Sequence, residues 1–343
     1  MRRPIGLLAA AMLLAGCTGG EPGLPPSSAA TTSPVTTSPV TTSPVTTSPV
    51  TTSPVTTSPA TTSPVTDGEG GEACPSFGPP EAVGTLAPAE LDEVSGIAAS
   101  RSLDGVLWVH EDSGAGPLIW GLDDEGSLLG TVVVGGAEAV DWEDIALGPG
   151  PSGGDWIYVA DTGDNAAIRP AVALYRFPEP DPSAGSVTAQ AIRVTYPAGP
   201  ADVEALLVDP ETGDAFLIAK RLLDAPEVYR VPAAAWDGGQ TVAERAGDLG
   251  LGLTALIGGP VTAADASPDG DLLAVRTYGA VWVWRRGPGT EVAAALAEAP
   301  CPAPAPPEIQ GEALALDEDG YLTVAEGAGA TLWRVTGESV SGR

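Results

Sequence analysis

The chain is 343 residues long and carries 45 acidic against 15 basic residues, which gives a net formal charge of −30 at pH 7. A surface this acidic repels nucleic acid and anionic lipid and attracts divalent cations, so we expect no nucleic-acid partner. The chain has a single histidine, His110, and a single lysine, Lys220, so arginine supplies nearly all of its positive charge.

The N-terminus has the pattern of a bacterial lipoprotein signal. Arg2 and Arg3 precede an apolar run at residues 4–13, and the sequence Leu-Ala-Gly-Cys that ends at Cys17 matches a lipobox, where signal peptidase II cleaves. The apolar run is too short to span a bilayer as a mature helix. We therefore predict that residues 1–17 are a signal and that a lipid on Cys17 anchors the protein to the outer face of the cytoplasmic membrane, in the cell envelope. Ordinary secretion is the alternative.

Residues 18–73 are predicted to form a disordered stalk. Between residues 31 and 65 the sequence Thr-Thr-Ser-Pro-Val occurs seven times, with Ala60 as the one variant. Proline in every repeat removes a backbone donor, and threonine and serine have little to bury, so no packed core forms. An extended chain at ~3.1 Å per residue would reach on the order of 100 Å. The composition is typical of O-glycosylated stalks, and an unglycosylated spacer fits equally well.

Residues 74–343 are long enough to form one large core. They contain two cysteines, Cys74 at the entrance of this domain and Cys301 in a proline-rich segment near its end. Two thiols outside the cytosol are expected to pair. The predicted disulfide would tie the start of the domain to the last part of its fold.

Five similar segments organise this domain. Each is a short apolar strand that opens with a carboxylate or hydroxyl and is followed by a turn and a second strand, and the segments are roughly 45 to 61 residues apart. Turns such as Ser-Pro-Asp-Gly at residues 267–270 are strong hairpin signals. Repeats of this kind predict the blades of a β-propeller. The segments are residues 93–97, 141–145, 202–206, 262–266 and 310–314.

Each interval accommodates four strands, so the domain is predicted to be all-β. The last interval has only three clear strands, and residues 82–86 are expected to supply the fourth, which would close the ring between the two ends of the domain. We favour five blades, with six as the alternative. The strands expected in the second interval are residues 145–147, 156–160, 172–177 and 187–196.

In a propeller, the starts of the innermost strands and the ends of the second strands meet around one mouth of the central channel. Several carboxylates that converge there raise one another's pKa or bind a cation, and Ca²⁺ suits flexible oxygen ligands outside the cytosol. The alternative is that these acids accept backbone and arginine hydrogen bonds and hold neighbouring blades together. The candidate metal ligands are Glu143, Glu204, Asp265 and Glu312.

The ends of the second strands supply candidate ligand-binding residues at the same mouth. For the segment at residues 161–165 the alternative is a turn held by its own aspartate side chains. The candidates are His110, Asp112, Asp161, Asp164, Asn165, Lys220, Arg221, Arg276 and Glu326.

Several segments resemble, in their residues and in their order, a family of secreted bacterial β-propeller lipoproteins, most of which are uncharacterised. Its members commonly carry Asp-Trp-Glu-Asp-Ile-Ala, here residues 141–146, then a Gly-Asp-x-Gly-x-Asn-like loop and an arginine, here Arg169. The resemblance extends from residue 93 to about residue 326 and implies a fold and a location more than a reaction. The matching segments are residues 94–97, 108–114, 141–146, 157–165 and 202–206.

A weaker similarity is to β-propeller phytases, which are calcium-dependent phosphoester hydrolases. It implies that the four candidate metal ligands hold calcium and that Lys220, Arg221 and Arg276 contact the substrate. The chain departs from the phytase pattern because it has one lysine and no dense basic cluster.

Two function classes follow from the sequence. The first is a surface-tethered, monomeric recognition module that binds a small polar ligand, glycan or protein partner at the acidic mouth. The alternative is a calcium-dependent hydrolase of phosphoester or lactone type. A recognition module would bind without turnover, whereas a hydrolase would require the metal for turnover.

Overall fold

The computed structural model describes residues 74–337 except residues 89 and 253–257. The predicted signal, the lipidation site Cys17 and the predicted stalk lie outside the described residues. Within the described part of the chain, no helix has both the length and the apolar character needed to cross a bilayer.

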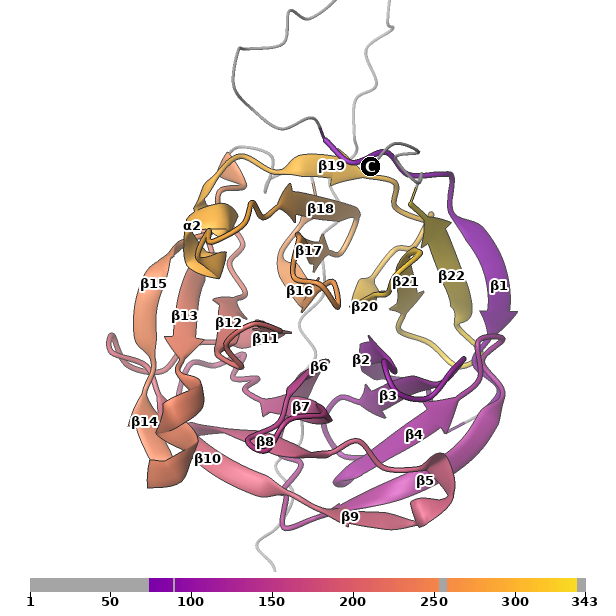
Figure 1. The fold of residues 1–343 in the computed structure, drawn as a ribbon, viewed down its shortest axis with the longest axis horizontal. Helices are drawn as coiled ribbons and strands as arrows, with labels where there is room; N and C mark the ends of the chain where they lie inside the picture. Colours follow the sequence, from indigo (N-terminus) through magenta and orange to yellow (C-terminus); the bar gives the residue numbers. More distant parts are fainter. Residues whose placement is uncertain (1–73, 89, 253–257, 338–343) are drawn as a thin grey trace, which may run out of the picture. The chain divides into compact units, whose positions relative to one another are not determined.

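Five sheets are arranged around a central axis as the blades of a β-propeller (Figure 1). This confirms the all-β prediction and the favoured number of five blades. In the first three blades the strands are, innermost first, β2 (Val94–Ala99), β3 (Leu107–Glu111), β4 (Leu118–Leu122) and β5 (Leu128–Gly135); β6 (Trp142–Pro149), β7 (Asp155–Asp161), β8 (Val172–Pro178) and β10 (Gln190–Thr195); and β11 (Val203–Val208), β12 (Ala215–Ala219), β13 (Glu227–Val231) and β15 (Glu244–Asp248).

The fifth blade is completed by a strand from the start of the domain. β1 (Glu81–Thr85) pairs antiparallel with β22, as the sequence predicts, and closes the ring. The disulfide between Cys74 and Cys301, whose Cα atoms are 5.6 Å apart, is also as predicted. The fourth blade consists of β16 (Val261–Ala266), β17 (Leu272–Thr277), β18 (Ala280–Arg285) and β19 (Cys301–Ala303), and the fifth of β20 (Gly311–Leu316), β21 (Gly320–Ala325), β22 (Thr331–Thr336) and β1.

One predicted strand is wrong in its extent. Residues 187–196 are divided between β9 (Ser186–Thr188), which pairs in parallel with β5 of the preceding blade, and β10. After β8 of the second blade, the 3₁₀-helix η1 (Pro182–Ala184), capped by the Asp181 side chain, leads the chain to the edge of the first blade, and the chain then returns to the second blade as β10. That detour pairs edge backbone groups which would otherwise be free.

The third blade repeats this detour. After β13 the 3₁₀-helix η2 (Ala233–Gly238) leads to β14 (Gln240–Val242), which pairs in parallel with β10 of the second blade. A short α-helix, α2 (Val292–Ala297), which the sequence pattern did not predict, packs Val292 and Leu296 between the third and fourth blades.

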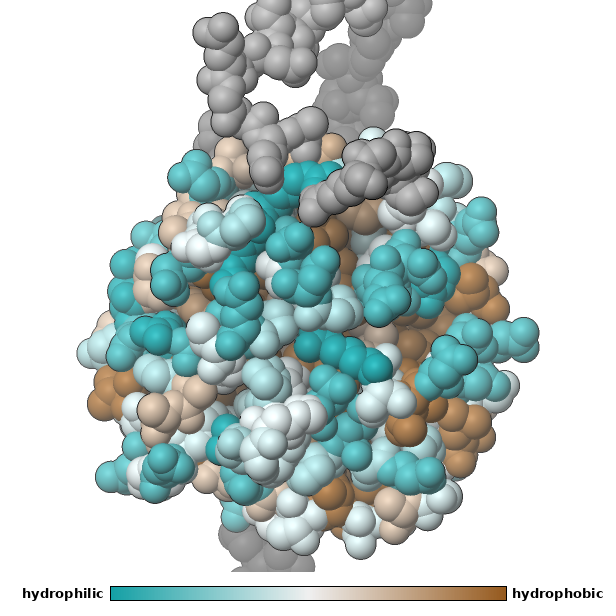
Figure 2. All heavy atoms as spheres, viewed as in Figure 1, coloured by the Kyte–Doolittle hydropathy of each residue, from teal (hydrophilic) through white to brown (hydrophobic). Residues whose placement is uncertain are grey.

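The hydrophobic core lies between adjacent blades. Five clusters of buried side chains fill the five interfaces; the one between the first and second blades packs Trp108 and Ile119 against Ile145 and Val159. Hydrophobic burial of this kind is the main favourable term in folding. Hydrophilic residues dominate the face of the domain shown in Figure 2.

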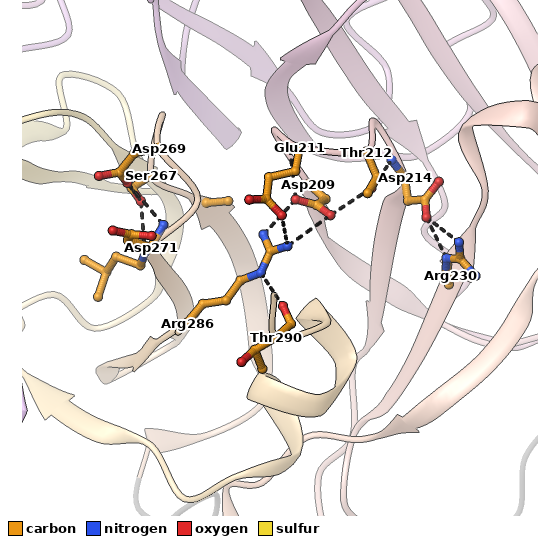
Figure 3. A network of polar contacts seen from close by, with 12 residues as sticks. Asp209, Glu211, Thr212, Asp214, Arg230, Ser267, Asp269, Asp271, Arg286 and Thr290 are labelled. Carbon is orange, nitrogen blue, oxygen red and sulfur yellow. Dashed lines mark hydrogen bonds and ion pairs between the residues drawn. The ribbon is translucent and has the colours of Figure 1, made fainter. Parts of the chain in front are cut away.

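A buried arginine links the third and fourth blades at the end of the inner strands that lies away from the predicted mouth. Arg286 follows β18, and its Nη1 lies 2.7 Å from Asp209 Oδ1 and its Nη2 2.8 Å from Glu211 Oε2, both in the turn between β11 and β12. Its Nε donates to the carbonyl of Thr290 in its own blade. Figure 3 shows the guanidinium between the two blades. These contacts join the two turns, and loss of Asp209 would leave the buried guanidinium without its buried counter-charge.

Candidate functional site

Every inner strand begins with the same irregularity. In β6, Trp142 pairs with Asp161 and Asp144 with Ala160, so Glu143 between them has no partner on β7. The same register shift occurs in the other four blades, and such a β-bulge re-aims the extra side chain. The five bulged residues are Ser95, Glu143, Glu204, Thr262 and Glu312.

Two of the five bulged residues link blades. The hydroxyl of Ser95 donates to the carbonyl of Glu143 at 2.7 Å, and the hydroxyl of Thr262 donates to the carbonyl of Gly311 at 2.8 Å. Each bond joins one inner strand to the inner strand of the next blade. The remaining three bulged residues are the glutamates, all buried.

Glu143 is the centre of an acidic cluster. Its carboxylate belongs to two groups of possible metal ligands, one with Asp112 and Asp141 and one with Asp202 and Glu204, and within each group the ligand atoms lie within 4.8 Å of one another. The cluster therefore draws on three successive blades. We refer to these groups as the first triad (Asp112, Asp141, Glu143) and the second triad (Glu143, Asp202, Glu204).

Asp141 and Asp202 belong to the cluster but were not among the ligands predicted from the sequence. Each lies two positions before a bulged glutamate, in Asp141-Trp-Glu143 and Asp202-Val-Glu204. This repeated Asp-x-Glu spacing is the signal that would have identified both.

The loop after β7 is built around these carboxylates. A Cβ atom on Gly163 would lie 1.9 Å from Glu143 Oε1 and 2.5 Å from Asp141 Oδ2, so only glycine leaves room for them. Asp161 accepts the backbone N–H of Asp141 at 3.2 Å, and the N–H of Asp164 donates to Asp202 Oδ1 at 2.9 Å. The loop therefore positions one aspartate of each triad.

The basic groups nearby are already paired. Lys220 Nζ lies 2.5 Å from Glu204 Oε1, and Arg169 Nη2 lies 2.7 Å from Asp161 Oδ1. No ion pair within the described residues includes a member of the first triad. The first triad thus has no direct ion pair among the described residues, although the charge of Arg169 acts to lower the pKa of Asp141.

The pKa values of these groups reflect that crowding. Burial, and then the carboxylates of Glu204, Asp112, Asp141 and Asp202, raise the pKa of Glu143 well above its usual range. Burial and the neighbouring Asp112 raise the pKa of Asp141 to about 6. Burial raises the pKa of Glu204 to about 7, although Lys220 acts in the opposite direction. Without a cation, the cluster therefore retains protons near neutral pH.

The other two predicted metal ligands lie outside both triads. Asp265 is buried, and its carboxylate accepts hydrogen bonds from the N–H groups of Ala266 at 2.8 Å and Leu316 at 2.9 Å. This matches the alternative that the predicted ligands accept backbone hydrogen bonds and hold neighbouring blades together. Burial and the charges of Glu204 and Glu326 raise the pKa of Glu312 to about 8. Of the four predicted ligands, the structure brings Glu143 and Glu204 together and places the other two elsewhere.

Two predicted ligand-binding residues are buried in the interior. His110 is fully buried with its ring edge-on to Trp142 at 5.7 Å, and burial lowers its pKa to about 4. Arg276 is 1% exposed and ion-paired with Glu308, and a Cβ on Gly311 would lie 1.7 Å from its Nη2. Both side chains are buried in this structure, and their ligand-binding role stays a prediction.

The remaining predicted residues lie in the loops at the mouth. Asp164 accepts the N–H groups of Ile168 and Arg169, the turn that the sequence analysis gave as the alternative, and Asn165 is exposed beside it. Arg221 pairs with Glu227 at 2.7 Å. Glu326 accepts a hydrogen bond from the Gln310 side chain at 2.8 Å.

The raised pKa values predict an unusual pH dependence. In calcium-free protein, folded Glu204 and Glu312 hold protons that the unfolded chain has already released above its ordinary pKa of 4.5. The folded state therefore binds more protons, and the free energy of unfolding should fall as pH rises from about 6.5 to 8.5. Unfolded His110, with an ordinary pKa of 6.5, is about half protonated at pH 6.5 and opposes this trend there, whereas above about pH 7.5 it is largely neutral in both states.

Urea unfolding at pH 6.5, 7.5 and 8.5 in EDTA measures this slope. A saturating divalent cation should remove only the part of the slope that comes from protons on Asp141 and Glu143, which it replaces at the first triad, and should leave the part that comes from Glu312. Stability that rises with pH in EDTA would show that the carboxylates are already ionised and paired in the folded state.

Fold and site together define a five-bladed β-propeller with a carboxylate cluster at one channel mouth. No family model matches the chain, and no curated protein matches it. Among solved structures, it is similar to a gluconolactonase from Xanthomonas campestris, with 12% identity over 78% of this chain and 98% of that chain and a TM-score of 0.41. It is also similar to the apo form of a soluble aldose sugar dehydrogenase from Escherichia coli, with 10% identity over 76% of this chain and 99% of that chain and a TM-score of 0.40.

Proposed function

We propose that this chain is a lipid-anchored, extracytoplasmic propeller that binds a divalent cation at the first triad. Through that cation it binds a small polar ligand, glycan or protein partner. The observation that carries the proposal is Glu143, a buried carboxylate whose strongest electrostatic neighbours are four other carboxylates. A hard cation with oxygen ligands is the natural counter-charge, and Ca²⁺ tolerates the irregular geometry of carboxylates from different blades.

The disulfide supports the proposed location. The bond between Cys74 and Cys301 requires an oxidising compartment, which the cytosol does not provide in most bacteria. This agrees with the lipobox at Cys17 and with the threonine-rich repeat that follows it.

Thermal unfolding tests cation binding. A ligand at 100 times its Kd stabilises the folded state by about 2.7 kcal/mol. For a domain of this size we expect Ca²⁺ to raise Tm by about 5 °C or more relative to EDTA. A Tm that is the same in Ca²⁺, Mg²⁺ and EDTA would contradict the proposal.

The hydrolase alternative rests on the same carboxylate. Glu143 has a raised pKa and shares the second triad with Glu204, which pairs with the ammonium of Lys220. A carboxylate of this kind can accept a proton in general base catalysis. The test is release of product from phosphomonoesters and lactones in Ca²⁺, with Glu143→Gln as the matched inactive variant. Turnover lost in that variant would favour the enzyme, and ligand binding without turnover would favour the recognition module.

The anchor has a separate test. Cys17→Ser is expected to move the protein from the membrane fraction into the medium without a change in Tm, because the predicted stalk separates lipid and domain. Fractionation and immunoblotting measure the effect, with Thr18→Ala as the control that stays in the membrane. Retention of both variants in the membrane fraction would exclude Cys17 as the anchor.

A further inference from the structure

We propose that the ammonium of Lys220 takes the place of a second divalent cation in the second triad. The mouth then holds one metal ion beside one fixed positive charge, and it selects ligands with an anionic group such as a carboxylate or phosphate. The inference rests on the proposed function, because it assigns the metal ion to the first triad.

The blade repeat places Asp112 and Lys220 at equivalent positions. Each directly follows the second strand of its blade, and each backbone N–H donates to the residue before the inner strand, at 2.9 Å from Asp112 to Glu93 and 3.0 Å from Lys220 to Asp202. In the first blade this position supplies a carboxylate to the first triad. In the third blade it supplies an ammonium to the second triad.

The contacts of Lys220 show that the second triad already accepts a cation. Its Nζ lies 2.5 Å from Glu204 Oε1, and the two side chains are only 19% and 5% exposed. The same nitrogen lies 5.3 Å from the centre of the Tyr278 ring, which favours a positive charge there. A divalent ion bound by Glu204 would have to displace this ammonium, so the second triad is closed to metal while Lys220 is present.

The first triad has the opposite character. Glu143 is shared by both triads, yet the first has no ion pair to a basic side chain within the described residues. A metal ion held there would share the Glu143 carboxylate with the triad whose Glu204 pairs with Lys220. An ammonium has three donors, and Lys220 uses two of them on Glu204 and the Tyr278 side chain, so one hydrogen is left for an anion that contacts the metal ion at the same time. The two positive charges therefore favour anionic ligands over neutral ones.

Calcium stoichiometry tests the substitution of a metal ion by Lys220. Isothermal titration calorimetry with Ca²⁺ should give one site in the wild-type protein, one in Lys220→Arg, and two in Lys220→Met. The double variant Lys220→Met/Glu204→Gln should return to one site, because the second triad has lost a ligand. Arg245→Met removes one positive charge from β15 of the same blade, where Arg245 pairs with Asp248 outside the triads, and should keep one site. Circular dichroism of each variant checks that it is folded.

The outcomes separate this inference from the proposed function. One site in both wild type and Lys220→Met would overturn the role of Lys220 and leave the proposed function standing. Two sites in the wild type would have the same two consequences. No site in any variant would overturn both. No site in the wild type with one site in Lys220→Met would support the role of Lys220 and overturn the first triad.

Anion binding tests the ligand class. In saturating Ca²⁺, methyl phosphate and lactate serve as phosphate and carboxylate probes. The double variant Lys220→Met/Glu204→Gln has one calcium and no ammonium, so it should bind the preferred probe at least tenfold more weakly than wild type, whereas Lys220→Arg should retain binding. Equal affinity in wild type and double variant would overturn the assignment of an anionic ligand to Lys220.

Discussion

Glu143→Gln is expected to lower calcium affinity by about 100-fold or more, since it removes the carboxylate shared by both triads. It should not destabilise the calcium-free protein. Glu143 is surrounded by Glu204, Asp112, Asp141 and Asp202, so an amide in its place relieves repulsion rather than breaking an ion pair. Tm in EDTA should therefore stay the same or rise, while the increase caused by Ca²⁺ disappears.

Glu312→Gln is the matched control for that variant. Glu312 is also a buried glutamate at a bulged position, but it lies outside both triads. Its substitution should leave the calcium response intact. The assignment of the first triad fails if both variants lose the response, or if Glu143→Gln retains it.

Asp144→Ala is expected to lower the free energy of unfolding by about 4 kcal/mol, because each buried N–H left without an acceptor costs about 1–3 kcal/mol. The Asp144 carboxylate accepts three backbone N–H groups, from Ile145 at 2.9 Å, Leu206 at 2.8 Å and Ala264 at 3.1 Å. It thereby links the inner strands of the second, third and fourth blades.

Chemical denaturation followed by tryptophan fluorescence measures this loss. Asp144→Asn retains one acceptor oxygen and should lose less stability than Asp144→Ala. If Asp144→Ala costs less than about 1 kcal/mol, water replaces the lost acceptor and the carboxylate is not the link between the blades.

The blades and their closure could be predicted from the sequence because the signals are local. Hairpin turns such as residues 267–270 and short β-rich runs define the repeat, and the missing strand of the last blade indicated the role of β1. The parallel additions β9 and β14 could not be predicted in the same way. Their pairing depends on which edge strand of the neighbouring blade is free, and three residues are too few for a sequence pattern that indicates the pairing partner.

The site was partly predictable for a related reason. Glu143 and Glu204 were recognisable because they recur at the start of inner strands. The bulge was not recognisable, so Asp265 was placed in the ring although Thr262 occupies the bulged position of that blade. The burial of His110 and Arg276 was not recognisable, because strands β3 and β17 are buried on both faces and the alternation of residues then does not show where a polar side chain points.

Crystallographic anomalous scattering from protein crystals soaked in Ca²⁺, or in Mn²⁺ as a stronger scatterer, tests the central claim most directly. The account predicts a single strong peak at the channel mouth, about 2.3–2.6 Å from carboxylate oxygens of Asp112, Asp141 and Glu143 for Ca²⁺. It also predicts that Lys220 remains on Glu204. A map with no peak among these carboxylates, from crystals in which they are fully ordered, would contradict it.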